Sequence, residues 1–409
     1  MIVVRTIQLS MDGMFKLFQI NSVVNWGSTG KIAEAIGCIS QSIGGKSFIA
    51  YGRKANPSRS ELIKIGRWVN PYIHFAKQSL LDCEGLCSRR ATKKLIAEIE
   101  AIVPDIIQLH NIHDHYLNYK ILFEYLNRTD IKVVWTFHDC WAFTGHCFHF
   151  VTKNCELWKT QCGRCPLRNI SPKTLLDRSE RNFRLKKSLF AANRNLTIVA
   201  CSDWMADFVR DSFLKDKRIQ TIHNGIDLNV FKPFNTNKRE SKTFNVLAVS
   251  NVWHKSKGLY DIFELRKMLP LEYSITIVGL SSKQIETLPH GIRGIQRTQN
   301  VQDLVKLYSD SDVFINPTYA DTFPTVNLES LACGTPVITY DTGGSPEAID
   351  EKTGVVIPQG DVKALAEAII QMKESPLSSV DCRSRAEQYF DKDKCFRQYI
   401  ALYEELLAQ

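Results

Sequence analysis

Short apolar, β-prone runs alternate with helix-like segments along almost the whole of this 409-residue chain. The runs lie at 15–21, 46–52, 105–111, 132–139 and 196–202 in the first half, and at 244–251, 274–280, 291–298, 311–318 and 335–341 in the second. Such alternation is typical of βαβ units, in which helices cover both faces of a parallel sheet. A chain of this length exceeds one ordinary core. We therefore predict an α/β protein with two Rossmann-like domains.

The composition is that of a globular protein, with 44% hydrophobic and 23% charged residues. No apolar run reaches the roughly 18 residues that a bilayer-spanning helix needs. The start of the chain has neither the long apolar region nor the small-residue cleavage site of a secretory signal, so we expect a cytoplasmic protein. Residues 1–13 are expected to be a disordered tail or an upstream start.

The chain has a net charge of +9, and part of its excess of basic residues lies in the segment 164–194, where basic and apolar residues alternate. One explanation is an amphipathic helix with a buried apolar stripe and a solvated basic face. The alternative is peripheral attraction to anionic lipid at the inner membrane, or to a lipid-diphosphate acceptor. No nucleic-acid recognition motif accompanies the charge, so we expect no nucleic-acid partner.

Two carboxylates follow the strand-like run at 311–318. Asp321 lies just past the carboxyl end of that run, where open parallel sheets bind ligands. Glu329 comes about two helical turns later. Both acids could also be explained as a pair at a helix N-terminus, which the helix macrodipole favours.

This pattern, with the GTPV and GGSPE sequences after it, resembles the E-x7-E motif of retaining glycosyltransferases of family 4. Asn-Gly-Ile-Asp at 224–227 resembles the signature that this family carries between its domains. The resemblance implies a GT-B fold, in which two Rossmann-like parallel-sheet domains face a central cleft. The expected parts are an acceptor-side domain at 14–226 with a cysteine-rich insertion at about 140–168, a nucleotide-sugar domain at 227–385, and a C-terminal helix at 386–409 that crosses back.

The resemblance also assigns roles at the donor site. Glu329 is expected to accept hydrogen bonds from the ribose hydroxyls, and Asp321 to hold hydroxyls of the donor sugar. Lys257, in a Lys-Gly element, is expected to neutralise the diphosphate, with Lys255 or His254 replacing the family's absent arginine. The expected donor-binding set further includes Thr322, Phe323, Gly343 and Gly344. Asp321 stands where the family has glutamate, which leaves the sugar open.

In the first domain, Gly27 and Gly30 open a helix and resemble the glycine-rich loop that the family places near the donor diphosphate. His138 ends the run 132–139 and matches the histidine that the family presents to the donor sugar. His110 and His113 are expected on the acceptor side. Buried structural histidines are the alternative for all three.

Four of the twelve cysteines, Cys147, Cys155, Cys162 and Cys165, fall within 23 residues of the segment 145–167. A C-x2-C pair can grip one tetrahedral ion, and two further thiols complete a four-sulfur set, so we predict a structural zinc site. Reduced free thiols and an iron–sulfur cluster are the alternatives. The transfer reaction itself is expected to need no cofactor.

The resemblance implies a retaining glycosyltransferase of the hexosyltransferase type, which uses a UDP- or GDP-sugar and a glycan or lipid-linked acceptor. By resemblance, its setting is bacterial exopolysaccharide, colanic acid or capsular polysaccharide biosynthesis. No side chain is an obvious nucleophile, and the resemblance implies front-face attack on the donor. The alternatives are a non-catalytic sugar-nucleotide-binding protein, a GT-B nucleotide-sugar epimerase and a phosphorylase.

Overall fold

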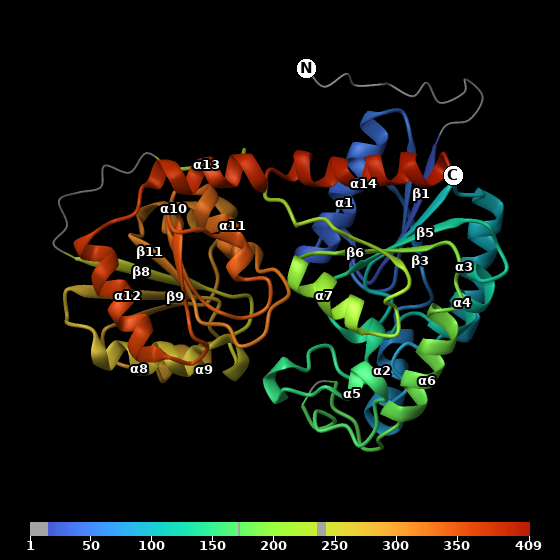
Figure 1. The fold of residues 1–409 in the computed structure, drawn as a ribbon, viewed down its shortest axis with the longest axis horizontal. Coiled ribbons are helices and arrows are strands. Elements are labelled where there is room, and N and C mark those ends of the chain that lie inside the picture. Colours follow the sequence, from blue (N-terminus) through green and yellow to red (C-terminus); the bar gives the residue numbers. More distant parts are fainter. Residues whose placement is uncertain (1–14, 171, 235–242) are drawn as a thin grey trace.

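The computed structural model describes residues 15–170, 172–234 and 243–409, so the expectation for residues 1–13 lies outside the described residues. Two parallel sheets lie side by side, each surrounded by helices (Figure 1). Among the described residues, no helix combines the length and apolarity needed to cross a bilayer.

The first sheet has seven strands in the order β3-β2-β1-β4-β5-β6-β7. The chain runs from β1 outward to β3 and then returns to the other side of β1, so β1 and β4 flank a topological switch point. The strands are β1 (Lys16–Asn21), β2 (Lys46–Tyr51), β3 (Glu61–Lys64), β4 (Ile106–Leu109), β5 (Lys132–Phe137), β6 (Leu196–Ala200) and β7 (Arg218–Thr221). The main helices are α1 (Gly27–Ser42), α2 (Asn70–Leu81), α3 (Arg89–Ile102), α4 (Tyr119–Leu126), α6 (Ser179–Phe190) and α7 (Asp203–Asp211).

The second sheet has six strands in the order β10-β9-β8-β11-β12-β13, with its switch point between β8 and β11. The strands are β8 (Phe244–Val249), β9 (Tyr273–Val278), β10 (Ile292–Ile295), β11 (Val313–Asn316), β12 (Val337–Tyr340) and β13 (Gly354–Ile357). The helices are α8 (Leu259–Met268), α9 (Ser282–Glu286), α10 (Val301–Asp310), α11 (Thr325–Ala332) and α12 (Val362–Glu374).

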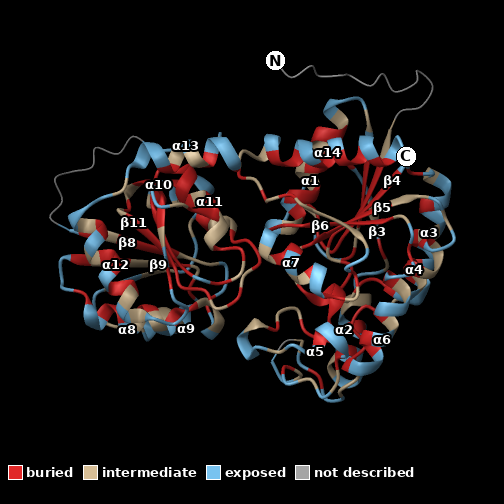
Figure 2. Cartoon of the chain, viewed as in Figure 1, coloured by how far each residue is buried: buried red, intermediate tan, exposed pale blue. Residues whose placement is uncertain are grey.

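Each of the ten predicted runs contains a strand, so the prediction of two parallel α/β sheets is confirmed. The central strands of both sheets are almost continuously buried (Figure 2). Helices cover both faces of such sheets, and this is why the runs are apolar at successive positions. Three edge strands, β3, β7 and β13, were not among the ten runs. Each is only four residues long, β3 is mostly exposed and β7 is half-buried throughout, so these strands carry a weaker pattern of buried residues.

The chain passes between the two sheets twice, and the two passages are hydrogen-bonded to each other. The Ile226 N–H donates to the Phe390 carbonyl at 2.7 Å, and the Lys392 N–H donates to the Ile226 carbonyl at 3.1 Å. A Cβ on Gly225 would lie 2.4 Å from the Cα of Lys392, so this close approach requires glycine.

The last two helices pack on different sheets. Helix α13 (Ser379–Tyr389) lies against α11, whereas α14 (Lys392–Leu407) lies against α1 (Figure 1). Two tyrosines of α14 reach the first sheet, where the Tyr403 hydroxyl donates to Gln108 Oε1 at 2.9 Å and the Tyr399 hydroxyl is 3.0 Å from Thr136 Oγ1. The final helix therefore completes the core of the first sheet.

The basic segment forms α6, which starts only at Ser179. Its apolar face is buried and Arg181 and Arg184 are exposed, as a core-facing stripe requires. Lys186 departs from the expected solvated face. Its Nζ is buried and donates to the carbonyls of Trp141 at 2.6 Å and Thr144 at 3.0 Å. Loss of hydration lowers the pKa of Lys186 to about 7.

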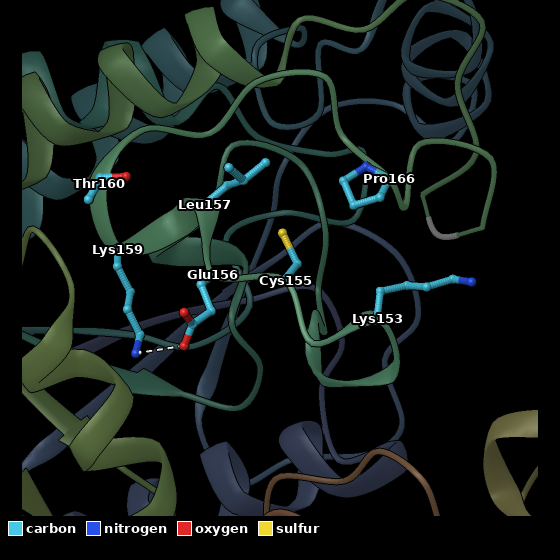
Figure 3. Close-up of a pocket in the computed structure, with 7 residues that line it drawn as sticks. All are labelled: Lys153, Cys155, Glu156, Leu157, Lys159, Thr160 and Pro166. Carbon is cyan, nitrogen blue, oxygen red and sulfur yellow. Dashed lines mark hydrogen bonds and ion pairs between the residues drawn. The ribbon is translucent and has the colours of Figure 1, made fainter.

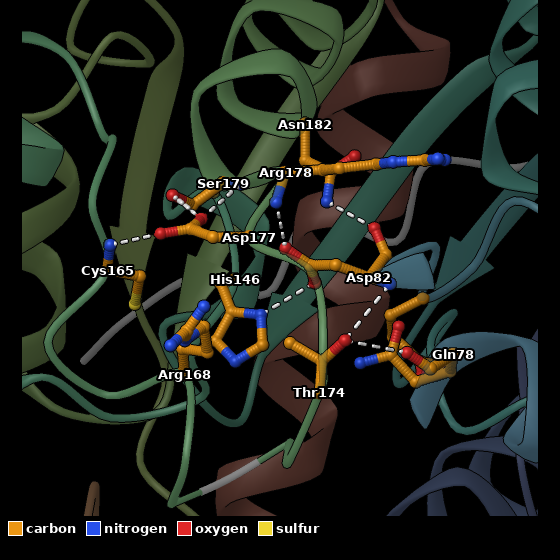
Figure 4. A network of polar contacts seen from close by, with 12 residues as sticks. Gln78, Asp82, His146, Cys165, Arg168, Thr174, Asp177, Arg178, Ser179 and Asn182 are labelled. Carbon is orange, nitrogen blue, oxygen red and sulfur yellow. Dashed lines mark hydrogen bonds and ion pairs between the residues drawn. The ribbon is translucent and has the colours of Figure 1, made fainter. Parts of the chain in front are cut away.

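The cysteine-rich segment is anchored to the end of α2 through Asp82 (Figure 4). One carboxylate oxygen of Asp82 lies 2.6 Å from His146 Nδ1, and the other accepts from the Arg178 N–H at 2.8 Å. The Asp82 N–H donates to Thr174 Oγ1 at 3.1 Å. This network fixes both ends of the segment on the first sheet's side of the molecule.

Candidate glycosyl-transfer site

Lys257 and Asp321 meet at the carboxyl edge of the second sheet. Lys257 ends the short turn η3 (Lys255–Lys257) after β8, and Asp321 follows β11, so the two residues come from either side of the switch point. Lys257 Nζ lies 2.6 Å from Asp321 Oδ2. The side chains are 26% and 23% exposed, so the ion pair remains open to solvent.

Two glycines pack against the backbone beside Asp321. Gly343 has φ 59°, and a Cβ there would lie 1.7 Å from the Asp321 carbonyl oxygen. A Cβ on Gly344 would lie 2.3 Å from the carbonyl oxygen of Thr322, which accepts the Gly344 N–H at 3.1 Å. The structure thus brings Gly343 and Gly344 to the expected loop, where they allow close backbone approach.

Glu329 projects from α11 and is partly exposed. Its Oε2 accepts a hydrogen bond from the Tyr308 hydroxyl at 3.0 Å. Loss of hydration raises the pKa of Glu329 to about 7, while the Tyr308 hydrogen bond and the charge of Lys31 act in the opposite direction. Lys31 belongs to α1, so Glu329 faces the first sheet across the junction.

The first sheet reaches the Asp321 loop at His138, where the Thr322 hydroxyl donates to the His138 carbonyl at 2.9 Å. His138 Nε2 is 3.2 Å from His110 Nδ1, and His110 Nε2 is 3.1 Å from Gln19 Oε1. Burial lowers the pKa of His138 to about 4 and holds the pKa of His110 well below its usual value. Both rings are therefore neutral at pH 7, and a neutral imidazole can exchange hydrogen bonds with sugar hydroxyls.

His113 is paired with a carboxylate rather than with the other two histidines. Its Nε2 lies 2.8 Å from Asp139 Oδ2. Burial acts to lower the pKa of His113, but the Asp139 charge and hydrogen bond outweigh it, and the net shift is upward. His113 therefore differs from His138: its pKa is raised, which favours the protonated ring, whereas the pKa of His138 is lowered.

His149 is a site residue that we did not predict. Burial lowers its pKa, and the charges of Asp139, Asp321 and Lys257 all act on it, so its ring lies between the two sheets' polar groups. Its Nδ1 is buried without a hydrogen-bond partner. The available signal was its place two residues after Cys147, but that stretch was interpreted only as a metal-binding segment.

The other expected donor residues differ in their burial. The Phe323 side chain is only 3% exposed and packs with His223 at 4.8 Å between ring centroids, so its ring belongs to the core. Lys255 is exposed on η3. Gly27 begins α1 with φ 62° and open space around it, whereas Gly30 is packed 3.1 Å from the Asn25 nitrogen.

Glu347, the last residue of the GGSPE sequence, lies at the junction between the sheets. Its carboxylate accepts from the backbone N–H groups of Asp203 and Trp204 and from His223 Nε2, each at 2.8 Å. It therefore caps the start of α7 and ties the second sheet to the first.

The four cysteines of the expected zinc site share one partly buried region but do not form a sulfur tetrahedron. Cys162 Sγ accepts the Gly145 N–H at 3.3 Å. Within the described residues, no three of these thiols lie within 4.8 Å of one another. A bound Zn²⁺, whose sulfur ligands lie about 2.3 Å from the metal, would need the thiols to move closer together. The zinc site stays a prediction.

A cavity of about 520 Å³ opens beside Cys155, lined also by Lys153 and Pro166 (Figure 3). A second cavity, of about 600 Å³, is lined by Phe75, His115 and residues 172–175. Neither is lined by Lys257 or Asp321.

Comparison with known proteins identifies the class. Residues 49–230 match the family model described as Glycosyltransferase Family 4, and residues 243–375 match the one described as Glycosyl transferases group 1. A colanic acid biosynthesis glycosyl transferase of Escherichia coli is 25% identical over 74% of this chain and 77% of its own. N,N'-diacetylbacillosaminyl-diphospho-undecaprenol alpha-1,3-N-acetylgalactosaminyltransferase of Campylobacter jejuni is 26% identical over 49% of this chain and 58% of its own.

Solved structures share the fold. Sucrose-phosphate synthase from Thermosynechococcus elongatus superposes with a TM-score of 0.72 at 18% identity, covering 96% of this chain and 99% of its own. HepE of Anabaena in complex with UDP superposes with a TM-score of 0.66 at 14% identity, covering 96% and 100%. Two parallel sheets joined by a double crossover, with polar groups on the facing loops, define a GT-B glycosyltransferase. The chain therefore has the two domains of a glycosyltransferase, a family 4 domain at 49–230 and a group 1 domain at 243–375.

Proposed function

We propose that this glycosyltransferase moves a sugar from a UDP- or GDP-sugar to a glycan or lipid-linked glycan, with retention of the anomeric configuration. The observation that carries the proposal is the Lys257–Asp321 ion pair, which lies at the switch point of the second sheet. A lysine there supplies the positive charge that a leaving diphosphate needs. Its carboxylate partner supplies acceptors for sugar hydroxyls.

Donor binding would redistribute these contacts. The diphosphate competes with Asp321 for Lys257, and this frees the Asp321 carboxylate to accept hydrogen bonds from the donor sugar. Glu329, which already accepts one hydrogen bond from Tyr308, has further lone pairs for the ribose diol. His138 approaches the same loop from the first sheet through its hydrogen bond with Thr322.

In the proposed reaction, the bond between the anomeric carbon and the diphosphate oxygen breaks as the acceptor oxygen bonds to that carbon on the same face. The acceptor proton passes to an oxygen of the leaving diphosphate. Lys257 stabilises the charge that develops on that group, and this electrostatic stabilisation is worth most where water is partly excluded. The residues near the pair include no side chain that we assign as a covalent nucleophile.

The acceptor class rests on two supports. The names of the relatives place one in colanic acid biosynthesis and describe the other by a diphospho-undecaprenol acceptor. In addition, an apolar patch lies on and beside α2, formed by Trp68, Tyr72, Phe75, Leu80 and Leu175, each more than half exposed. Exposed lysines, Lys77 and Lys173, lie in the same two segments. Apolar side chains with basic neighbours suit contact with an anionic membrane surface.

The test is nucleotide release from a panel of UDP- and GDP-sugars by wild type and by Glu329→Ala, with slow donor hydrolysis read without acceptor. Release from one donor, lost in the variant, is expected. Tight nucleotide binding without release, even with lipid-linked acceptors, would instead favour a sugar-nucleotide-binding protein. That second candidate is supported by aspartate at position 321 and by the absence of an arginine beside Lys257.

A further inference from the structure

Three ligand-type side chains converge where α2 and the segment leading to α3 meet the loop after β4. His74, Glu84 and His115 each place one ligand atom within 4.8 Å of the other two. His74 is 1% exposed, Glu84 is 5% exposed, and the His115 side chain is 17% exposed. The three residues come from separate segments of the chain, so only the fold brings them together.

His74 Nε2 is buried and has no hydrogen-bond partner, although buried polar atoms are nearly always satisfied in folded proteins. Glu84 Oε2 and His115 Nδ1 form an ion pair at 2.7 Å. A divalent ion at the centre of the trio would give His74 Nε2 a partner and would replace the ion pair by two metal bonds.

The remaining atoms of the cluster are held by other contacts. Glu84 Oε1 accepts the N–H groups of Asp114 at 2.8 Å and His115 at 3.1 Å, which fixes the carboxylate. His74 Nδ1 lies 3.3 Å from Ser88 Oγ, which leaves Nε2 directed at the cluster. Contacts of this kind orient the ligands of protein metal sites.

We propose that His74, Glu84 and His115 bind a divalent transition metal of the Zn²⁺ class. Two imidazoles and one carboxylate form a donor set that zinc accepts. A zinc ion held by three protein ligands keeps a fourth position for water.

A metal there would lock together α2, the 82–88 segment and the loop that carries His113. His115 and Phe75 also line the cavity of about 600 Å³, so the ion would fix one wall of that cavity. The inference does not depend on the proposed donor or acceptor.

A second trio, Asp203, His223 and Glu347, also comes within 4.8 Å but differs in one respect. The carboxylate of Glu347 already accepts three hydrogen bonds, one of them from His223 Nε2. It therefore has no need of an ion, and it provides a matched control.

The experiment measures zinc per chain in the full-length protein, stripped with a chelator, reloaded with Zn²⁺ and freed of excess metal. Glu84→Gln keeps the shape of the side chain and an oxygen for the Asp114 and His115 N–H groups, but removes the anionic ligand. We expect Glu84→Gln and His115→Ala each to hold one zinc fewer than wild type, and His223→Ala to hold the wild-type amount. Any zinc on the four cysteines is common to all four proteins and cancels in the difference.

Equal zinc content in wild type and Glu84→Gln would overturn the proposal. Circular dichroism checks that each variant is folded. If a variant does not fold, Co²⁺-loaded wild type is compared with His74→Asn. A change in the visible absorption of the bound cobalt supports the site, and identical spectra count against it.

Discussion

Replacement of Lys257 by alanine tests the proposed chemistry most directly. The substitution removes the cation 2.6 Å from Asp321 and leaves the loop backbone in place. If Lys257 stabilises the leaving diphosphate, its loss should mainly slow the reaction rather than unfold the protein.

The size of the effect follows from the exposure of the pair. Removing one preorganised group from a charge-stabilising site costs about 2.7–4 kcal/mol, or about 10²–10³-fold in kcat. Because Lys257 and Asp321 are 26% and 23% exposed, water screens part of the interaction, and we expect the lower end, about 10²-fold. The same exposure limits the stability effect, and the free energy of unfolding should fall by no more than about 1 kcal/mol.

The assay is nucleotide release from the donor that wild type uses, measured as kcat/KM, with urea unfolding of the same samples. Lys283→Ala is the matched control, because Lys283 is an exposed lysine on α9 of the same sheet. It should match wild type in both measurements. A loss below tenfold in Lys257→Ala would refute the role of Lys257. A loss of several kcal/mol in stability would show that the pair is structural.

Three further results are expected. Because the pKa of Glu329 is about 7 in the folded protein, against 4.5 ordinarily, kcat/KM should rise as pH increases through about 7, and Glu329→Gln should abolish that rise. The folded state holds the Glu329 proton more tightly than the unfolded state does. The free energy of unfolding of wild type, measured by urea titration, should therefore fall as the pH rises from about 4.5 to 7. The same measurement on Glu329→Gln should show a weaker dependence on pH. Thr322→Val, which removes the hydrogen bond to the His138 carbonyl, should lower the free energy of unfolding by about 1 kcal/mol, and no change would mean that the contact is not made in solution. If the four-cysteine cluster binds zinc, the double variant Cys155→Ser and Cys162→Ser should lose one zinc per chain by elemental analysis, and unchanged zinc would exclude it.

The places of the candidate donor-site residues in the fold could largely be predicted from local sequence. The positions of His138, Lys257 and Asp321 just after strand-like runs place them at the carboxyl edges of their sheets, because parallel strands all end at the same edge. The direction in which each side chain points was harder to predict from the sequence. Phe323 lies in the same loop as Asp321, but its ring is in the core, since neighbouring loop residues can point in opposite directions.

Other functional contacts had no local signature. His149 and Asp321 are far apart in the chain, and they come close only because the cysteine-rich segment folds back toward the second sheet. His74, Glu84 and His115 show no motif spacing, since each lies on a different segment. Lys186 was predicted to lie on a solvated face, but its Nζ is buried and donates hydrogen bonds to the carbonyls of Trp141 and Thr144.

The sequence by itself determined the two parallel sheets, because a strand that is buried on both faces has apolar residues at successive positions. It also placed the polar residues that end those strands. Only the tertiary structure decided which of these residues meet: the pairing of Lys257 with Asp321, the hydrogen bond of Thr322 to His138, and the return of α14 to the first sheet. These contacts depend on strand order and on the path of the crossovers, and neither is encoded in the spacing of adjacent side chains.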